Sequence, residues 1–231
     1  MSDVSELVDA GMRRQIEDFR AALRGGMPRL GWKVGLNDPA AQQRLGLPGP
    51  VVVWLNGRRL IRDGVPYDPP AGARPRIEAE TAILLGSDVD GAATPDEALA
   101  AIAAVAPAIE FVDATKPLSP LDALLGNDIL HEAVLIGPSQ RPEQANGLVD
   151  AGFPKVSKNG EDAGSGLAGR YPDNLGVIVA AVASTISGFG EALRAGDWII
   201  GGSYIDPFDV ASGDAVEANF GPLGVISFSV A

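Results

Sequence analysis

The sequence predicts a β-rich α+β protein in which short strands outnumber helices. Gly (29) and Pro (18) are abundant without any period in the 231 residues, which is typical of many turns and short strands. Apolar residues make up 46% of the chain and charged residues 21%, a balance typical of a globular protein. The length suits one sizeable core, so we expect a single domain over 1–231, with a helical N-terminal extension at 1–30 and a β-rich core at 31–231.

Three segments have helical patterns. Residues 5–24 repeat apolar side chains at helical spacing, and Gly25 and Gly26 follow as an end signal. In TPDEALAAIAAVA, Thr94 is a good N-cap, Pro95 suits the first helical position and Glu97 completes a capping box. We predict a third helix over residues 175–187. The apolar positions of the first segment are Val8, Met12, Ile16, Phe19 and Leu23.

Strands are expected between these helices. Residues 31–36 form a short strand candidate, and VVVWLNGRRLI (51–61) is typical of a hairpin that turns at Asn56-Gly57. Strand character returns at 133–136, and the chain ends in two strands around a turn at 221–224. We interpret residues 155–171 as a Gly-rich loop, which lacks the Gly-Lys-Ser/Thr ending of a phosphate-binding loop.

Composition excludes several classes of function. The net charge of −12 disfavours nucleic acid and anionic membranes as partners. The absence of Cys excludes disulfides, thiolate metal ligands and a Cys nucleophile. The N-terminus has no apolar core like that of a signal peptide, and the longest apolar stretch (177–186) is short of the ~20 residues of a membrane-spanning helix. We therefore expect a soluble cytoplasmic protein.

Two carboxylates mark the segment ARPRIEAETAILLG (73–86). Glu78 and Glu80 are two residues apart in a predicted strand, so their side chains point to the same face. Glu110 lies in a second apolar run, PAIEFVD, where an unpaired Glu is rare. Clustered, partly buried carboxylates repel each other and need a cation, and Mg²⁺ or Mn²⁺ is the natural candidate. The alternative is the solvated face of an amphipathic strand.

Three further residues are candidate catalytic groups. Lys33, flanked by glycines on its short strand, could neutralise an anionic substrate or transfer a proton, although a surface lysine is the alternative. His131 is the only histidine, and no G-x-S-x-G motif accompanies it, so a Ser-His-Asp site has little support. Asp113 and Lys116 lie near Glu110 in the sequence and could support a metal site or simply be exposed.

Several blocks, in order, resemble a known family. GWKVGL, PRIEAETAILLG, AIEFVDATK, KNGEDAGSG and AGDWIIGGSYIDPFDVASGDAVEANFGPLGVISF look like the fumarylacetoacetate hydrolase superfamily. Within it they look most like the 2-keto-4-pentenoate hydratases and 4-oxalocrotonate decarboxylases. The resemblance covers nearly the whole chain from Gly31 onward. It implies a mixed β-roll of the type found in the C-terminal domain of fumarylacetoacetate hydrolase, in a single catalytic domain whose metal-binding core is 31–231.

The resemblance also implies roles for individual residues. Glu78, Glu80 and Glu110 match the three acidic residues that bind Mg²⁺ or Mn²⁺, and the metal chelates a 2-oxo acid and stabilises its enolate. Lys33 matches the family's lysine, which polarises the substrate or relays a proton. Two departures stand out: the sequence Asn56-Gly57-Arg58-Arg59 lies where many hydratases carry acidic residues, and His131 replaces a small residue.

The leading hypothesis is a divalent-metal-dependent hydratase-like lyase that acts on a small 2-oxo or 2-hydroxy-dienoic acid through a metal-bound enolate. Lys33, Asp113 and His131 are its candidate catalytic residues. Decarboxylation of an oxo-diacid is second, because Arg58 and Arg59 could hold a second carboxylate if they face the site. Acylpyruvate C–C hydrolysis is third, and a non-catalytic family member is the remaining alternative. We also expect a homo-oligomer.

Overall fold

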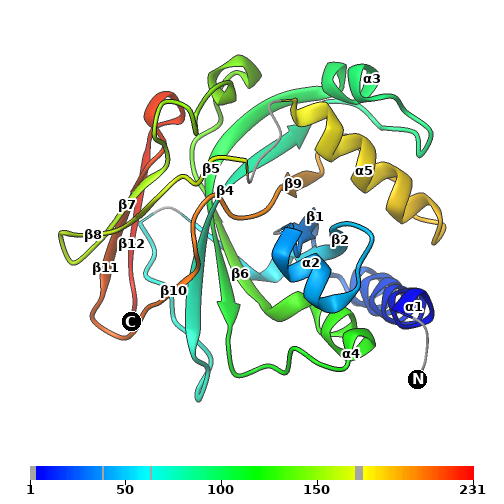
Figure 1. Cartoon of the computed structure of the whole chain (residues 1–231), viewed down its shortest axis with the longest axis horizontal. Helices are drawn as coiled ribbons and strands as arrows, with labels where there is room; N and C mark the ends of the chain where they lie inside the picture. Colours follow the sequence, from blue (N-terminus) through cyan, green and yellow to red (C-terminus); the bar gives the residue numbers. More distant parts are fainter. Residues whose placement is uncertain (1–3, 38, 63, 170–173) are drawn as a thin grey trace.

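A computed structural model describes residues 4–37, 39–62, 64–169 and 174–231. Its largest element is a curved sheet with the strand order β2-β1-β9-β4-β5-β6-β3, and β10 pairs with the end of β4 (Figure 1). The long antiparallel pair β4 and β5 forms its centre. The bounds of these strands are β1 Arg29–Gly35, β2 Val51–Asn56, β3 Leu60–Ile61, β4 Pro75–Leu85, β5 Ile102–Asp113, β6 His131–Ile136, β9 Trp198–Ile200 and β10 Phe208–Asp209.

A second, smaller sheet covers one side of the large one. Its strands β7 (Lys155–Lys158), β8 (Glu161–Ser165), β11 (Ala215–Asn219) and β12 (Val225–Ser229) run in the order β12-β11-β7-β8. Figure 1 places it beside β4 and β5, opposite the side where the helices lie. Phe111 of β5 connects the two sheets, because its ring packs edge-on against Phe228 at 4.8 Å and stacks on Tyr67 at 4.0 Å between ring centroids.

The helices pack on the other side of the curved sheet (Figure 1). In α1, the side chains of Met12, Ile16 and Phe19 are buried, as their spacing predicts. None of the helices in the described residues is long and apolar enough to cross a membrane. The bounds are α1 Val4–Arg24, α2 Pro39–Leu45, α3 Pro95–Ala100, α4 Leu121–Gly126 and α5 Leu175–Ser187, with 3-10 helices η1 Gly57–Arg59, η2 Asp128–Leu130, η3 Pro142–Ala145 and η4 Gly221–Leu223.

The α+β class is confirmed, and most predicted elements are present. The strands predicted at 31–36, 133–136 and around 221–224, and the helices predicted at 5–24 and 175–187, correspond to β1, β6, the β11–β12 pair, α1 and α5. The capping box of Thr94 and Glu97 is also present. The helix it starts is shorter than the pattern suggested, because residues from Ile102 onward join β5. Long-range pairing with β4 outweighs the local helical preference of this alanine-rich run.

The predicted hairpin at 51–61 is wrong. The Asn56 side chain accepts a hydrogen bond from Arg58 N and caps η1, and the short β3 then pairs in parallel with β6 rather than with β2. Gly57 does not serve a tight turn. A Cβ at this position would lie 2.0 Å from the carbonyl oxygen of Pro28, so this glycine permits a close backbone approach.

The Gly-rich loop predicted at 155–171 is also wrong over its described part, because residues 155–165 form a hairpin, while residues 170 and 171 lie outside the described residues. Strands β7 and β8 are antiparallel and turn at Asn159-Gly160, where both residues have positive φ (54° and 82°). This is the backbone that a two-residue hairpin turn requires, and Asn-Gly is the sequence that best adopts it. The Asn-Gly signal was therefore valid at 159–160 and misleading at 56–57.

We predict that Gly57→Ala destabilises the protein, because a methyl group has no space beside the Pro28 carbonyl. The free energy of unfolding should fall by about 2 kcal/mol or more. The matched control is Gly49→Ala, since a Cβ at Gly49 meets no atom within 4 Å. Urea denaturation of both variants checks the difference, and equal midpoints would contradict the close approach.

Candidate metal centre

Three carboxylates converge on one face of the β4–β5 pair. Glu78 lies directly opposite Glu110 in the antiparallel register, and Glu80 is two residues further along β4 on the same face. One carboxylate oxygen from each residue lies within 4.8 Å of the others. Like charges that face each other across a strand pair are destabilising, so this register needs a positive charge nearby. The solvated-strand alternative is wrong, since Glu80 and Glu110 are buried and Glu78 is half-buried.

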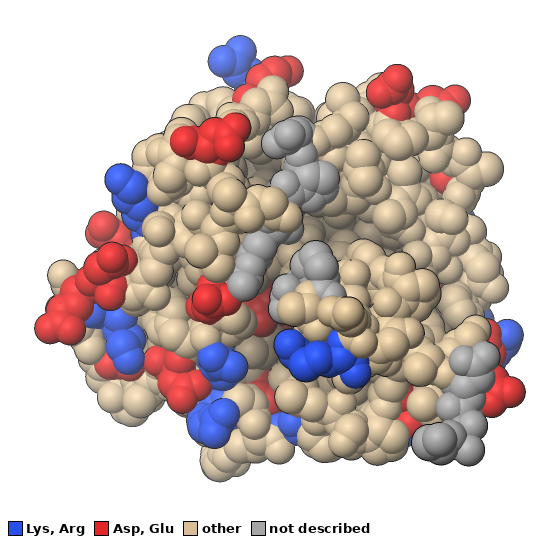
Figure 2. Space-filling model, viewed as in Figure 1, with Lys and Arg blue, Asp and Glu red and all other residues tan. Residues whose placement is uncertain are grey.

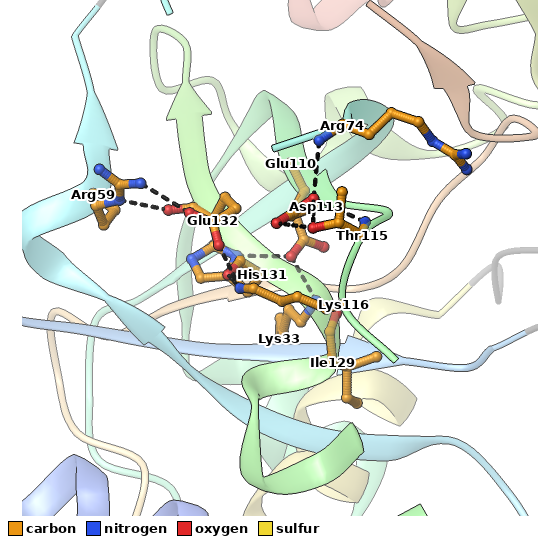
Figure 3. A network of polar contacts seen from close by, with 10 residues as sticks. All are labelled: Lys33, Arg59, Arg74, Glu110, Asp113, Thr115, Lys116, Ile129, His131 and Glu132. Atoms are coloured by element: carbon orange, nitrogen blue, oxygen red, sulfur yellow. Dashed lines mark hydrogen bonds and ion pairs between the residues drawn. The ribbon is translucent and has the colours of Figure 1, made fainter. Parts of the chain in front are cut away.

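Lys33 supplies one positive charge from β1. Its Nζ atom donates to Glu110 Oε1 at 2.5 Å and to the carbonyl oxygen of Ile129 at 3.0 Å (Figure 3). Its exposed fraction is 2%, so the surface-lysine alternative is wrong. Nδ1 of His131, on β6, lies 2.7 Å from the same Oε1. Burial tends to raise the pKa of the Glu110 carboxyl, but Lys33 and His131 together hold this pKa below its ordinary value.

Glu80 has the opposite electrostatic environment. Burial, followed by the negative charges of Glu110 and Glu78, raises its pKa well above the ordinary value. Its Oε2 accepts a hydrogen bond from Gly202 N at 2.8 Å, whereas its buried Oε1 has no hydrogen-bond partner in the described part of the chain. Gly202 is required at this position, because its φ is 104° and a Cβ would lie 2.4 Å from Nδ2 of Asn37.

These residues fit a hard divalent cation. A buried carboxylate oxygen without a partner is costly, and two neighbouring carboxylates add to the cost. Oxygen ligands of this kind are preferred by Mg²⁺ and Mn²⁺. One lysine cannot balance three carboxylates, so a cation would remove the remaining repulsion.

Asp113 has a structural role in this conformation. Its Oδ1 accepts hydrogen bonds from Arg74 N at 3.0 Å and from Thr115 N at 2.9 Å, and the Thr115 hydroxyl donates to both carboxylate oxygens (Figure 3). Although burial opposes it, these hydrogen bonds lower the pKa of the Asp113 carboxyl. The residue therefore closes the turn after β5, and both of its oxygens are engaged by Arg74 or Thr115.

A network of charged side chains, formed by Arg59, Glu132 and Lys116, holds the main chain at His131. Arg59 donates to the carbonyl oxygen and to Oε2 of Glu132, each at 2.9 Å, and Lys116 pairs with the other oxygen of Glu132. Lys116 also donates to the carbonyl oxygen of His131 at 3.0 Å (Figure 3). Arg58 donates to the carbonyl oxygen of Gly25. Both arginines line a pocket whose described lining contains none of the three glutamates, so they do not face the candidate metal centre.

The backbone that follows α4 is unusual. Asp128, Ile129 and Leu130 have consecutive positive φ values of 54°, 45° and 65°. Such a conformation costs on the order of 1–3 kcal/mol for each non-glycine residue and tends to occur at functional sites. Sequence reasoning missed this turn and its contact with Lys33. The Asn127-Asp128 pair is compatible with left-handed backbone, but no local signal predicts it for the β-branched Ile129.

The surface charge is mixed on the face drawn in Figure 2. This view shows a hollow near the centre of the face, with charged side chains of both signs scattered around it. Among the described residues, no large single-sign patch is seen on this face. This distribution gives no support to a nucleic-acid-binding surface on the face in view.

Comparisons with known proteins reveal distant relatives along most of the chain. No protein-family model matches it. The chain is 28% identical over 204 residues to 2-hydroxyhexa-2,4-dienoate hydratase of Comamonas testosteroni, a match covering 86% of this chain and 76% of the relative. It is 27% identical over 206 residues to 4-oxalocrotonate decarboxylase of a Pseudomonas species, covering 88% of this chain and 79% of that protein.

Solved structures share the fold. The 4-oxalocrotonate decarboxylase of Pseudomonas putida G7, complexed with magnesium and adipate, has a TM-score of 0.84 at 23% identity, covering 99% of this chain and 86% of that one. Fumarylpyruvate hydrolase of Pseudomonas aeruginosa, in complex with Mn²⁺ and pyruvate, has a TM-score of 0.63 at 16% identity, covering 88% and 89%. The sequence resemblance to hydratases and decarboxylases of this kind is therefore confirmed by the relatives. The solved structures confirm the fold.

We predict that a divalent cation displaces a proton from Glu80. The raised pKa of Glu80 means that the folded, metal-free protein binds more protons here than the unfolded chain. The Glu80 carboxyl by itself therefore makes the free energy of unfolding fall as the pH rises above the ordinary pKa of a glutamate. The affinity for Mn²⁺ should increase as pH rises above the ordinary pKa of a glutamate, and binding should release protons.

Calorimetric titration with Mn²⁺ in two buffers of different ionisation enthalpy measures both quantities. Glu80→Gln should abolish the proton release and weaken binding by about tenfold or more. The exposed Glu217→Gln on β11 serves as a control and should behave as the wild type. Tight Mn²⁺ binding by Glu80→Gln would contradict the assignment of Glu80 as a ligand.

Proposed function

We propose that the protein is a divalent-metal-dependent lyase acting on a small 2-oxo or 2-hydroxy-dienoic acid, with addition of water to the conjugated double bond as its reaction. The observation that carries the proposal is the convergence of Glu78, Glu80 and Glu110 on one strand face with the buried Lys33 beside them. The relatives include the 2-hydroxyhexa-2,4-dienoate hydratase named above and a 2-keto-4-pentenoate hydratase of Paraburkholderia xenovorans (28% identical over 201 residues), and their names support this substrate class.

Glu78, Glu80 and Glu110 would hold the cation. When bound, Mg²⁺ or Mn²⁺ would supply a local positive centre that attracts and polarises the carboxylate and keto group of a 2-oxo acid. This centre matters because the chain has a net charge of −12, which repels an anionic substrate at long range.

Lys33 would hold positive charge at the substrate oxygen. Its ammonium is already desolvated and fixed by Glu110, so little reorganisation is needed when negative charge develops on the substrate. Its Nζ atom could also carry the proton that the reacting acid gains or loses.

His131 is the candidate for water activation. We assign its Nδ1 as the donor to Glu110 Oε1, which leaves Nε2 with a free lone pair. This buried Nε2 has no hydrogen-bond partner in the described residues. Burial lowers the pKa of the imidazole, despite the opposing effect of Glu110, so the ring stays neutral and able to accept a proton. Nε2 would take the proton of the attacking water, which the Asn56–Arg59 segment cannot do for lack of a carboxylate.

Two other reactions rank below hydration. Decarboxylation of an oxo-diacid has named relatives, but the guanidinium groups of Arg58 and Arg59 are engaged by Gly25 and Glu132 rather than available for a second carboxylate. Acylpyruvate C–C hydrolysis needs a His–carboxylate pair to activate water, and the 2.7 Å contact of His131 with Glu110 provides the required residue types.

The role of Lys33 is tested by Lys33→Met, which keeps most of the side-chain volume and removes the charge. Turnover should fall by about 10²-fold or more, while Mn²⁺ affinity stays near that of the wild type. Lys155→Met, at an exposed lysine on β7, is the control and should keep full turnover. Unchanged turnover of Lys33→Met would remove Lys33 from the reaction.

The reaction itself is tested by incubating the Mg²⁺-loaded protein with 2-hydroxypenta-2,4-dienoate, 4-oxalocrotonate and fumarylpyruvate, and identifying the products by NMR. We expect water addition to the first acid. Loss of CO₂ from the second without hydration of the first would establish decarboxylation instead, and cleavage of the third alone would establish C–C hydrolysis. Inertness towards all three with metal bound would favour another 2-oxo-acid reaction or a non-catalytic protein.

A further inference from the structure

The left-handed turn at Asp128–Leu130 is built against the lysine of the candidate site. Three consecutive residues with positive φ are rare outside glycine, and the middle one, Ile129, is β-branched. Strain of this kind persists only where the surrounding packing enforces it. The turn therefore has a reason in the tertiary structure rather than in its own sequence.

The turn directs the main-chain carbonyl group of Ile129 towards the Lys33 ammonium. Its oxygen lies 3.0 Å from Nζ of Lys33, whose second contact is with Glu110 Oε1 at 2.5 Å (Figure 3). A lysine ammonium has three N–H donors at fixed angles to one another. The two acceptors hold two of these donors and thereby set the direction of the third.

The side chain of Ile129 anchors the turn. It is buried in an apolar cluster with Leu47, Val51 and Val53. It also packs over Gly35, where a Cβ would lie only 2.8 Å from Cδ1 of Ile129. Gly35 is two residues after Lys33 on β1, so a side chain at position 35 would point to the same side of the strand as Lys33. Because residue 35 is glycine, the Ile129 side chain occupies that space instead.

We propose that Ile129 is a positioning residue that holds the Lys33 ammonium in one orientation through its main-chain carbonyl, with Gly35 as the residue that admits its side chain. The third N–H of Lys33 is then directed at the substrate oxygen. This catalytic consequence rests on the function proposed above, whereas the orientation of the ammonium can be measured without any substrate.

The test exploits the fit between Gly35 and Ile129. Gly35→Ala should push the Ile129 side chain and its turn away from Lys33. Adding Ile129→Val removes the Cδ1 atom that the new methyl group meets, so the double variant should restore the turn. The readout is the ¹H–¹⁵N NMR signal of the Lys33 ammonium, assigned by its loss in Lys33→Met, together with kcat and KM for the acid that the protein turns over.

We expect the wild type and the double variant to give a slowly exchanging ammonium signal. In Gly35→Ala this signal should shift or exchange too fast to be seen, and kcat should fall by about tenfold or more with little change in KM. Gly49→Ala, which adds a methyl group in open space, is the control and should resemble the wild type.

An ammonium signal that is unchanged in Gly35→Ala would overturn the proposal, and so would a double variant that folds but does not recover the signal. If Gly35→Ala does not fold, Leu130→Gly provides the second test. Glycine accepts φ of 65° but lacks the side chain that packs against the apolar cluster around Ile129, so the turn should loosen and the signal should weaken. A signal as strong as that of the wild type would refute the role. Recovery of the signal in a protein inert towards every 2-oxo acid would support the positioning while overturning the proposed function.

Discussion

The repulsion among three carboxylates on the β4–β5 pair is the constraint on which the rest of the site depends. Glu78 and Glu110 face each other because the register puts them there, and Glu80 joins them two residues along the strand. The protein offsets part of this repulsion with Lys33, His131 and the N–H group of Gly202. Both donors from Lys33 and His131 converge on Glu110 Oε1, which leaves the other oxygen of Glu110 available to a cation. The partnerless Oε1 of Glu80 points to the same requirement.

The opposite face of the same strands explains how this arrangement is tolerated. Alternation along β5 puts Glu110 on one face and Phe111 on the other, and Phe111 is fully buried between Tyr67 and Phe228. Moving the register by one residue would bring Glu110 into this apolar contact and Phe111 into the carboxylate cluster. The apolar packing between the two sheets therefore fixes the register that brings the glutamates together. Apolar packing stabilises one face of the sheet, and repulsion among the carboxylates destabilises the other. Such a conflict is common at functional sites.

Sequence reasoning was most successful where the physics is local. The spacing of Glu78 and Glu80 fixes their common face, and the capping box at Thr94 and Glu97 is a local interaction. It failed where the same dipeptide has two different roles. Asn-Gly forms a hairpin turn at 159–160, whereas at 56–57 the glycine is needed because the chain passes close to Pro28. The resemblance to known blocks predicted the three glutamates and Lys33 as a set. The pairing of Lys33 with the Ile129 carbonyl could not be predicted, because the left-handed turn depends on packing around residues distant in the sequence.

The network of charged side chains formed by Arg59, Glu132 and Lys116 bears on which reaction is favoured. Arg59 and Lys116 hold Glu132 between them, and Lys116 also holds the main chain of His131. Releasing Arg59 to bind a second substrate carboxylate would break its hydrogen bonds to the carbonyl oxygen and to the carboxylate of Glu132, whose side chain is only 13% exposed. The support of the imidazole would then be weaker. For the function proposed above, this arrangement suits a substrate whose charge would be met at the cation site and Lys33, and it keeps the only histidine of the chain fixed beside Glu110. A fixed, neutral imidazole next to a carboxylate is suited to activating water, which hydration and C–C hydrolysis both need and decarboxylation does not.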